Sequence, residues 1–242
     1  MTETPSSGDA ARLLTNLTKA APGKREIVAA SELAPELALL RTWQTERLKK
    51  TYADLLNSKR YRPAAEFFLN DIYAPRDFSQ RDADLERFHQ GVSKVLPDRA
   101  IAILNDAVAL NQLTDRLDRD MVALLFNDLG AKDAITTEQY SEAYRILDNR
   151  ADRLRQIELV GQIGYGVEKL VKIPFIGATL KLAHAPAVLT GWSELQGFLE
   201  RGYAAFKHMN GAAGFLQPVK ERETRILEAL YSGAPDPFAI GA

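Results

Sequence analysis

The sequence predicts an all-α fold, a single-domain bundle of about ten helices. Apolar residues return at every third or fourth position along most of the 242 residues, which is the period of an amphipathic helix. We find no run of alternating β-branched residues bounded by turn residues, which a half-buried strand requires. Short connectors containing proline or glycine separate the helical segments.

Ten helices are expected, at residues 9–19, 35–57, 63–73, 79–96, 98–129, 136–147, 149–172, 176–182, 186–209 and 214–231. The tripeptide 21–23, Ala-Pro-Gly, separates the first helix from the second. Pro35 and Pro63 suit the first turns of the second and third helices, because the N–H that proline lacks has no partner there. Ser79 and Asp82 have the spacing of a capping box, which predicts the start of the fourth helix.

The helix at 98–129 is expected to be central, since one of its faces is apolar for about six turns. The residues of this face are Ile103, Ala107, Leu110, Leu113, Leu117, Met121 and Leu124. Gly130 supplies a C-terminal stop, and Thr136 or Thr137 opens the next helix. The helix at 149–172 shows the same apolar periodicity, and Pro174 marks the break that follows it.

The chain is expected to form one domain. No linker rich in proline, serine or charge divides it, and no fixed repeat is visible. We expect a disordered N-terminus at 1–8, a single helical domain at 9–231 and a flexible C-terminal tail at 232–242.

Composition excludes several function classes. The chain has no cysteine, which excludes disulfides, a thiolate nucleophile and Cys-ligated metals. With 31 Lys and Arg against 32 Asp and Glu, no global field attracts nucleic acid. The first residues lack the basic and apolar regions of a signal peptide, so a cytoplasmic location is expected. The most apolar window, 173–192, is too interrupted by prolines and polar residues to span a membrane.

Two landmarks resemble a family of uncharacterised bacterial proteins known by an FFLEELY-type motif. The first is Phe67-Phe68-Leu69-x-x-Ile72-Tyr73, followed by Asp77-Phe78 and Arg81-Asp82-x-Asp84. The second is Pro186-Ala187-x-x-x-Gly191 with Leu195-Gln196-x-Phe198-Leu199-Glu200-x-Gly202. Asn70, Asp71 and Ile72 stand where the motif has Glu, Glu and Leu. The resemblance covers about residues 37–231 and implies a helical bacterial protein with no assigned activity.

Two clusters of charged and polar residues are candidates for a polar or anion site: Arg81 with Asp82, and Arg150 and Arg153 with Gln156. If the clusters converge, their guanidinium groups would clamp a phosphate or carboxylate bidentately. The alternative is a structural ion-pair network around the turn after Tyr73.

Gly161 and Gly164 are candidate ligand-contact residues, together with His184. Glycine within a helix costs about 1 kcal/mol relative to alanine, so something should compensate. Close packing against a neighbouring helix is one explanation. The other is a kinked helix over a planar ligand such as haem, with His184 as the best-placed axial ligand.

No metal site is expected. Glu86 and His89 have the spacing of a di-iron ligand pair, but a second pair is missing. Asp115 and Asp118 have a spacing that can hold magnesium, although alternation with arginines favours a salt-bridged solvent face. No Gly-x-Ser-x-Gly nucleophile motif occurs, and the sequence indicates no catalytic residues.

Two functions are left open. The first is a non-enzymatic interaction or accessory role, with a protein partner or self-association. The second is a small-molecule or cofactor-binding protein, for haem or a metal, with an oxygenase-like pocket between helices.

Overall fold

The structure is a computed structural model that describes residues 34–73, 98–189 and 192–239. Within these ranges the protein contains nine α-helices and no strand, which confirms the all-α prediction. None of the described helices is long and apolar enough to cross a membrane. The helices expected at 9–19 and 79–96, with the Ser79 capping box, lie outside the described residues.

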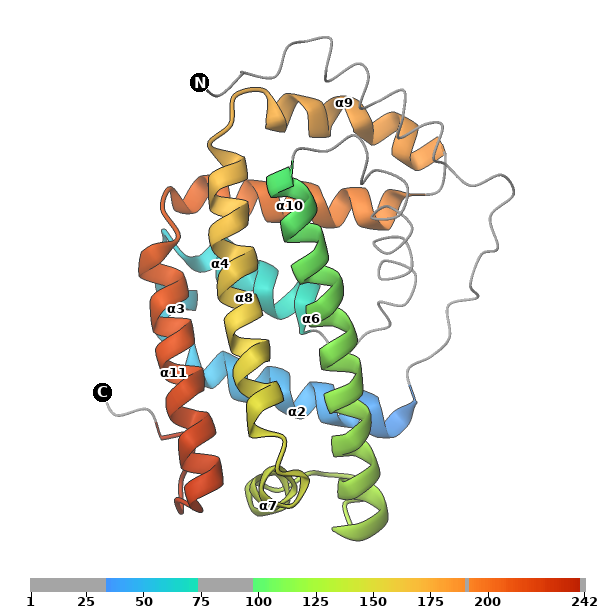
Figure 1. Ribbon diagram of the computed structural model, residues 1–242, viewed down its shortest axis with the longest axis vertical. Coiled ribbons are helices and arrows are strands. Elements are labelled where there is room, and N and C mark those ends of the chain that lie inside the picture. The colour runs from blue at the N-terminus through green and yellow to red at the C-terminus, as the bar shows by residue number, and fades with distance from the viewer. Residues whose placement is uncertain (1–33, 74–97, 190–191, 240–242) are drawn as a thin grey trace.

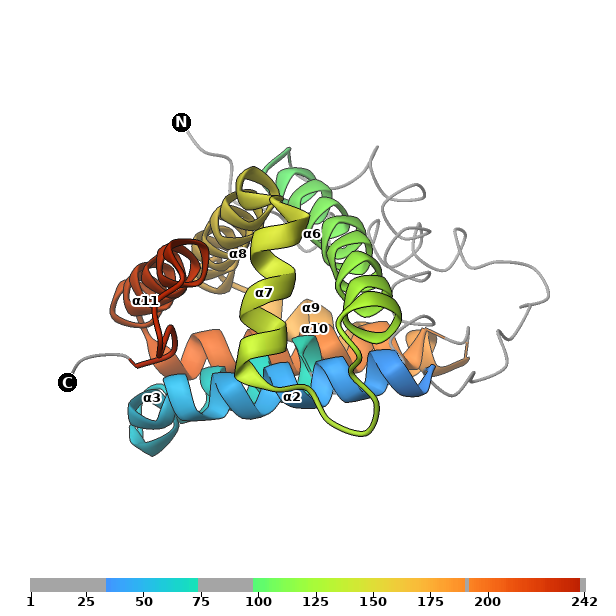
Figure 2. The same cartoon turned by 90° about the horizontal axis from the view of Figure 1, so that it is seen from below.

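In chain order the helices are α2 (Pro35–Thr51), α3 (Ala53–Asn57), α4 (Arg62–Phe67), α6 (Asp98–Ala123), α7 (Thr137–Leu147), α8 (Arg150–Val171), α9 (Ile176–Leu189), α10 (Ser193–Met209) and α11 (Ala213–Ser232). Two π-helical turns, Phe68–Ile72 and Leu124–Asp128, extend α4 and α6. Helices α6, α8 and α11 lie side by side in one layer, as Figure 1 shows. Figure 2 shows α2 and α10 crossing beneath them in a second layer, with α7 at one end. Helix α9 lies at the opposite end from α7.

Most helix boundaries follow the sequence signals. Helix α7 begins with a capping box in which Thr136 Oγ1 accepts from the Gln139 N–H at 3.2 Å, and Gln139 Oε1 accepts from the Thr136 N–H at 3.0 Å. The helix expected at 35–57 is divided at Tyr52, whose backbone leaves the helical conformation (φ −113°, ψ 25°).

The predicted boundary between the helices at 176–182 and 186–209 was wrong. Helix α9 continues past Pro186 to Leu189, and α10 begins at Ser193 rather than at Pro186. Proline removes one hydrogen bond from a helix interior. The helix here continues beyond it, and the Trp192 N–H donates to the Ala187 carbonyl at 2.7 Å after its end.

The two landmarks of the family resemblance contact each other. Phe67 in α4 packs against Gly202 and lies 5.2 Å, between ring centres, from Phe198 in α10. The buried Asp71 accepts from Arg201 Nε at 2.9 Å and Nη2 at 2.6 Å. Both landmarks therefore contribute to one helix–helix interface.

The described residues form two hydrophobic clusters in the interior. One joins the end of α2 to α3, α4, α10 and the start of α11. The other joins the start of α2 to the end of α6, α7 and the end of α11. Leu117 and Met121, from the predicted apolar face of α6, are fully buried.

Two glycines of α8 are packed against neighbouring helices. A Cβ at Gly164 would lie 2.6 Å from Leu216 in α11, and a Cβ at Gly166 would lie 2.5 Å from Ile103 in α6. A Cβ at Gly161 would meet nothing within 4 Å. Close packing therefore accounts for Gly164, whereas Gly161 has no packing reason to lack a side chain.

Alanine substitutions at Gly161 and Gly164 should have opposite effects. Gly161→Ala should raise the free energy of unfolding by up to about 1 kcal/mol, because alanine has the higher helix propensity. Gly164→Ala should lower it by about 1–3 kcal/mol, because the methyl group overpacks the buried Leu216. Urea unfolding followed by circular dichroism measures both. A stabilised Gly164→Ala would contradict the close packing of α8 on α11.

Candidate functional site

A cavity of about 100 Å³ lies between the two helical layers. Side chains from α2, α6, α7, α8 and α11 line it, and Phe238, from the segment after α11, closes part of its wall. Its residues belong in part to both hydrophobic clusters. The cavity nevertheless contains several charged groups, from α2, α6, α8 and α11.

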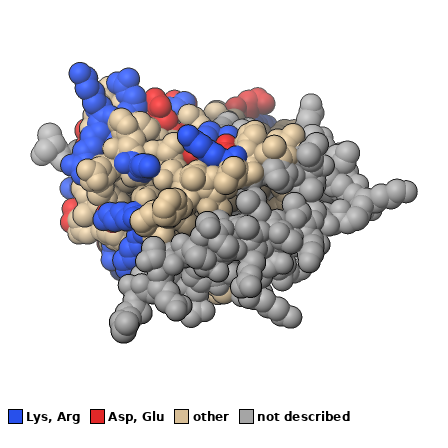
Figure 3. Space-filling view, turned by 90° about the horizontal axis from the view of Figure 1, so that it is seen from above, with Lys and Arg blue, Asp and Glu red and all other residues tan. Residues whose placement is uncertain are grey.

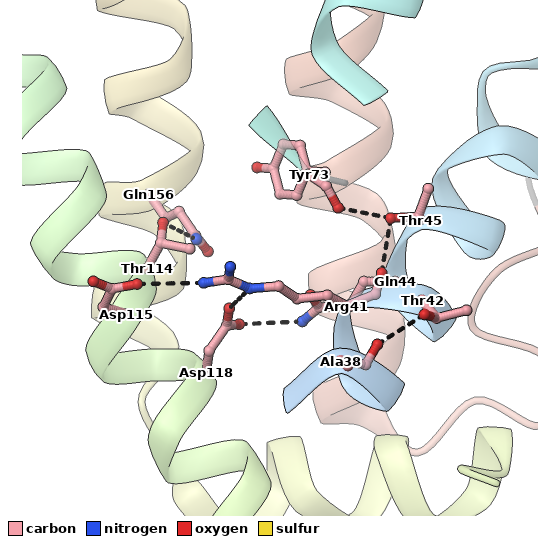
Figure 4. Close-up of polar contacts among 10 residues, drawn as sticks. All are labelled: Ala38, Arg41, Thr42, Gln44, Thr45, Tyr73, Thr114, Asp115, Asp118 and Gln156. Carbon is pink, nitrogen blue, oxygen red and sulfur yellow. Dashed lines mark hydrogen bonds and ion pairs between the residues drawn. The ribbon is translucent and has the colours of Figure 1, made fainter. Parts of the chain in front are cut away.

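Arg41 of α2 connects the two layers through α6. Its Nε lies 3.3 Å from Asp118 Oδ2, and its Nη2 lies 3.4 Å from Asp115 Oδ1 (Figure 4). Gln44, one turn along α2, donates to Asp118 Oδ1 at 3.4 Å. Burial raises the pKa of the Asp118 carboxyl, although the charges of Arg41 and Arg153 act in the opposite direction.

The predicted solvent face at 115–120 was wrong for Asp118. Its exposed fraction is only 4%. The partners of these side chains lie on other helices, since Asp115 and Asp118 meet Arg41, and Arg116 meets Asp152 of α8 at 2.9 Å. Charge alternation within one helix does not reveal such partners.

A second ion pair connects α2 to α11. Arg47 Nη1 lies 2.6 Å from Glu223 Oε1, and the Tyr52 hydroxyl donates to the same oxygen at 2.6 Å. Burial lowers the pKa of Arg47, but Glu223 together with Tyr140 and Tyr52 raises it above its usual value. Burial and Glu223 both raise the pKa of the Tyr52 hydroxyl above its usual range. Arg47 and Glu223 therefore form a charged pair with an additional hydroxyl donor.

Arg153, in the first turns of α8, differs from Arg41 and Arg47, which are each paired with a carboxylate. Its exposed fraction is 4%, and its Nε and Nη2 are buried without a hydrogen-bond partner in the described part of the chain. Its guanidinium carbon lies 4.5 Å from the centre of the Tyr144 ring. A cation–π contact of this kind contributes about 0.5–2 kcal/mol, but it satisfies no N–H group.

The enclosed charges leave an excess of one positive charge. Arg41, Arg47 and Arg153 are largely buried, and so are the carboxylates of Asp118 and Glu223. Asp115 is 44% exposed at its side chain and is therefore solvated. Protonation of Asp118 would only increase the positive excess. Because Arg153 lines the cavity, this excess charge would attract an anion that entered it.

Two of the residues predicted from the sequence, Arg153 and Gln156, line this cavity. Gln156 donates to Thr114 Oγ1 of α6 at 2.8 Å, which fixes its amide against α6. Arg150 lies one turn earlier on the surface, where it pairs with Glu228 of α11. Arg81 and Asp82 lie outside the described residues.

The other predicted residues do not line the cavity. Gly164 packs on Leu216, and Gly161 faces open space. His184 is exposed on α9, where its Nδ1 lies 3.0 Å from Glu200 Oε1. Over residues 34–73, 98–189 and 192–239, no three His, Cys, Asp or Glu side chains gather in a way that could hold a metal ion.

Sequence reasoning missed the contributions of α2 and α11, namely Arg41, Arg47, Tyr52 and Glu223. A signal was available in α2, because Arg41, Gln44 and Leu48 are spaced to share one helix face. Polar residues in line with a core leucine indicate a helix that buries charge.

Replacing Arg153 with an apolar side chain should cost the protein little. Arg153→Met roughly keeps the volume and removes a buried charge that has no carboxylate partner. The variant should therefore be at most about 1 kcal/mol less stable than the native protein, and it can be more stable. Arg47→Met is the matched control, because it leaves Glu223 without its cation and should cost on the order of 3 kcal/mol. Urea unfolding of both variants measures the difference. A loss at Arg153 as large as that at Arg47 would show that Arg153 serves the fold.

Asp118→Asn should change how stability depends on pH. The pKa of Asp118 in the folded state is raised above 3.8, so the unfolded chain releases this proton first as pH rises. The protein with Asp118 therefore loses stability relative to the Asp118→Asn variant as pH rises. The variant's advantage should grow with pH above 3.8, by at most about 1.4 kcal/mol per pH unit, and then level off. Urea unfolding at pH values from below 3.8 to neutral measures this trend. A difference that falls with pH would mean that Arg41 outweighs burial.

Comparison with known proteins gives a family and no activity. No curated protein and no solved structure matches the chain. One family model, described as a domain of unknown function (DUF8198), matches residues 24–237. This confirms the expectation of an uncharacterised family, and the protein belongs to the DUF8198 family.

Proposed function

We propose that the protein binds a small, singly charged organic anion in the cavity between its helical layers, with Arg153 as the residue that meets the negative group. The carrying observation is the buried Arg153 guanidinium, two of whose nitrogens have no hydrogen-bond partner at the cavity wall. Arginine stays charged at all physiological pH values. An unpaired charge in this position is costly unless an anion accompanies it.

The size of the cavity supports a small ligand. At about 100 Å³ it is smaller than pockets for drug-sized molecules, which measure roughly 300–1,000 Å³. An apolar cavity of about 150 Å³ holds a benzene molecule. A short-chain carboxylate, smaller than benzene, is therefore the appropriate size class, and the haem considered from the sequence is not part of this proposal.

The wall of the cavity supports an organic body on the anion. Apolar side chains from α8 and α11 line it, among them Ile157, Val160, Ile226 and Leu230. Water would hydrate the guanidinium but would not neutralise it or use this apolar wall. A carboxylate accepts hydrogen bonds from two parallel N–H groups of one guanidinium. An inorganic anion can accept the same hydrogen bonds, but it has no apolar part to contact the wall.

The interaction or accessory role with a protein partner, favoured first from the sequence, stays a prediction. The cavity contacts do not bear on it.

Anion binding should depend on Arg153 and not on Arg150. Propionate should raise the thermal midpoint of the native protein, and propionamide, which has the same shape without the charge, should not. Arg153→Gln should abolish the response, because the hydrogen-bonding charge is lost. Arg150→Gln should keep it, because Arg150 lies on the surface one turn away. Thermal melts and calorimetric titration measure the response.

Three outcomes would contradict the proposal. One is an equal response of Arg153→Gln and the native protein. Another is an equal response to propionate and propionamide. The third is no heat and no thermal shift with propionate, which would indicate that the cavity holds water only.

A further inference from the structure

Helix α9 presents an apolar face that its contacts with α8 and α10 leave exposed. Its outer face consists of Phe175, Ala178, Leu182, Ala185 and Val188, all exposed. The exposed fractions of Phe175, Leu182 and Val188 are 72%, 64% and 50%. Spacings of three and four place these residues on one side of the helix. Such a stripe is unusual on a surface that meets only water.

Contacts with α10 fix this orientation. The Tyr203 side chain packs directly on Gly177, where a Cβ would lie 2.5 Å from its hydroxyl. Gln196 Nε2 donates to the Leu180 carbonyl at 2.6 Å and to Glu200 at 2.8 Å. The inner side of α9 is therefore occupied, and the outer face cannot turn inward without breaking these contacts.

Phe175 occupies this face at a conformational cost. Its φ is 70°, in the left-handed region where a bulky residue is a rare outlier. The Phe175 carbonyl accepts from the Thr179 N–H at 2.8 Å and from the Thr179 hydroxyl at 3.1 Å. These bonds place Phe175 at the start of α9. Burial within the molecule does not offset the cost, because the ring is exposed.

The charged side chains around the outer face are positive, apart from Glu168 and Glu200, which pair with Lys172 and His184. No Asp or Glu occurs from Lys169 to Ser193, whereas Lys169, Lys172 and Lys181 are exposed. Lys172 pairs with Glu168 at 2.8 Å, just before this stretch. Figure 3 looks onto this end of the molecule, where blue basic groups lie on and along one side of a mainly tan surface and predominate over red ones.

We infer that the α9 outer face docks onto a membrane surface that contains anionic lipids, with α9 lying in the plane of the interface. Interfacial helices combine Phe and Leu on one face with lysines beside them. Protein interfaces are instead depleted in lysine at their cores. A single convex helix without acidic residues therefore fits a lipid surface better than a protein groove.

The length of α9 is consistent with this position. Its 14 residues extend about 21 Å, which is less than the roughly 30 Å of a bilayer core. The apolar side chains would enter the headgroup boundary while the lysines attract anionic headgroups.

The test is co-sedimentation of the full-length protein with vesicles of phosphatidylcholine alone, or of phosphatidylcholine and phosphatidylglycerol in equal parts. The native protein should bind the mixed vesicles more tightly, and added salt should weaken binding. Lys169→Gln and Lys181→Gln should each weaken it roughly fivefold. Phe175→Asn and Leu182→Ser should each weaken it by about tenfold or more.

Phe175→Asn keeps the test free from misfolding, because asparagine tolerates a positive φ better than phenylalanine. The matched control is Ile146→Ser, which removes an exposed apolar side chain (53% exposed) from α7 at the opposite end of the molecule. Its vesicle binding should equal that of the native protein.

The inference fails if the native protein binds neither vesicle type, if Phe175→Asn binds as well as the native protein, or if neutral and anionic vesicles bind equally. Self-association in sedimentation velocity that Phe175→Asn abolishes, without vesicle binding, would assign the face to a second copy of the chain and also overturn the inference.

Discussion

The constraint on which the rest of this structure depends is charge enclosed between two layers of helices. A buried ionised group is stable only when it is paired and hydrogen-bonded. Helix α2 brings in Arg41 and Arg47, and their carboxylates come from the facing layer, Asp118 from α6 and Glu223 from α11. Because both pairs must form at once, they define how α2 lies across α6 and α11. The hydrophobic clusters on either side then fill the space that this crossing leaves.

The same constraint explains why Arg153 has no carboxylate partner in the site. The two carboxylates inside the site are already engaged. The third guanidinium lies against the Tyr144 ring at 4.5 Å, and its Nε and Nη2 have no hydrogen-bond partner among the described residues. Buried donors without partners are rare in native proteins, and each calls for a physical explanation. Local rules that a chain breaks without compensation tend to mark functional positions. For this reason we assign Arg153, rather than the better-satisfied Arg41 or Arg47, as the centre of the proposed site.

The helices were predictable because their signals are local. The apolar spacing through Leu117 and Met121 and the cap at Thr136 each involve residues within one or two turns. The site was only half predictable for the same reason. Arg153 and Gln156 could be named from local charge density, but the groups facing them come from α2, α6 and α11, and no spacing within α8 indicates those neighbours.

Two particular features show the limit of local patterns. Asp118 sits in a run of alternating charges that is typical of a solvated face, yet the crossing of α2 buries it against Arg41. Phe238 follows the last helix, where no periodic pattern remains, and its ring lies 5.5 Å from the ring of Trp43 in an edge-on contact. Both positions are decided by tertiary contacts between segments far apart in the sequence.

Helix α8 connects the two proposed sites but also separates them. Arg153 lies near its start and the α9 outer face begins just beyond its end, which at 1.5 Å per residue is a distance of about 30 Å. Electrostatic effects between exposed charges are screened within about 8 Å at physiological salt. An anion at Arg153 therefore leaves the attraction between the lysines around α9 and a lipid surface unchanged. Any coupling between them must pass through movement of α8 itself, and the packing of Gly164 and Gly166 against α11 and α6 opposes such movement.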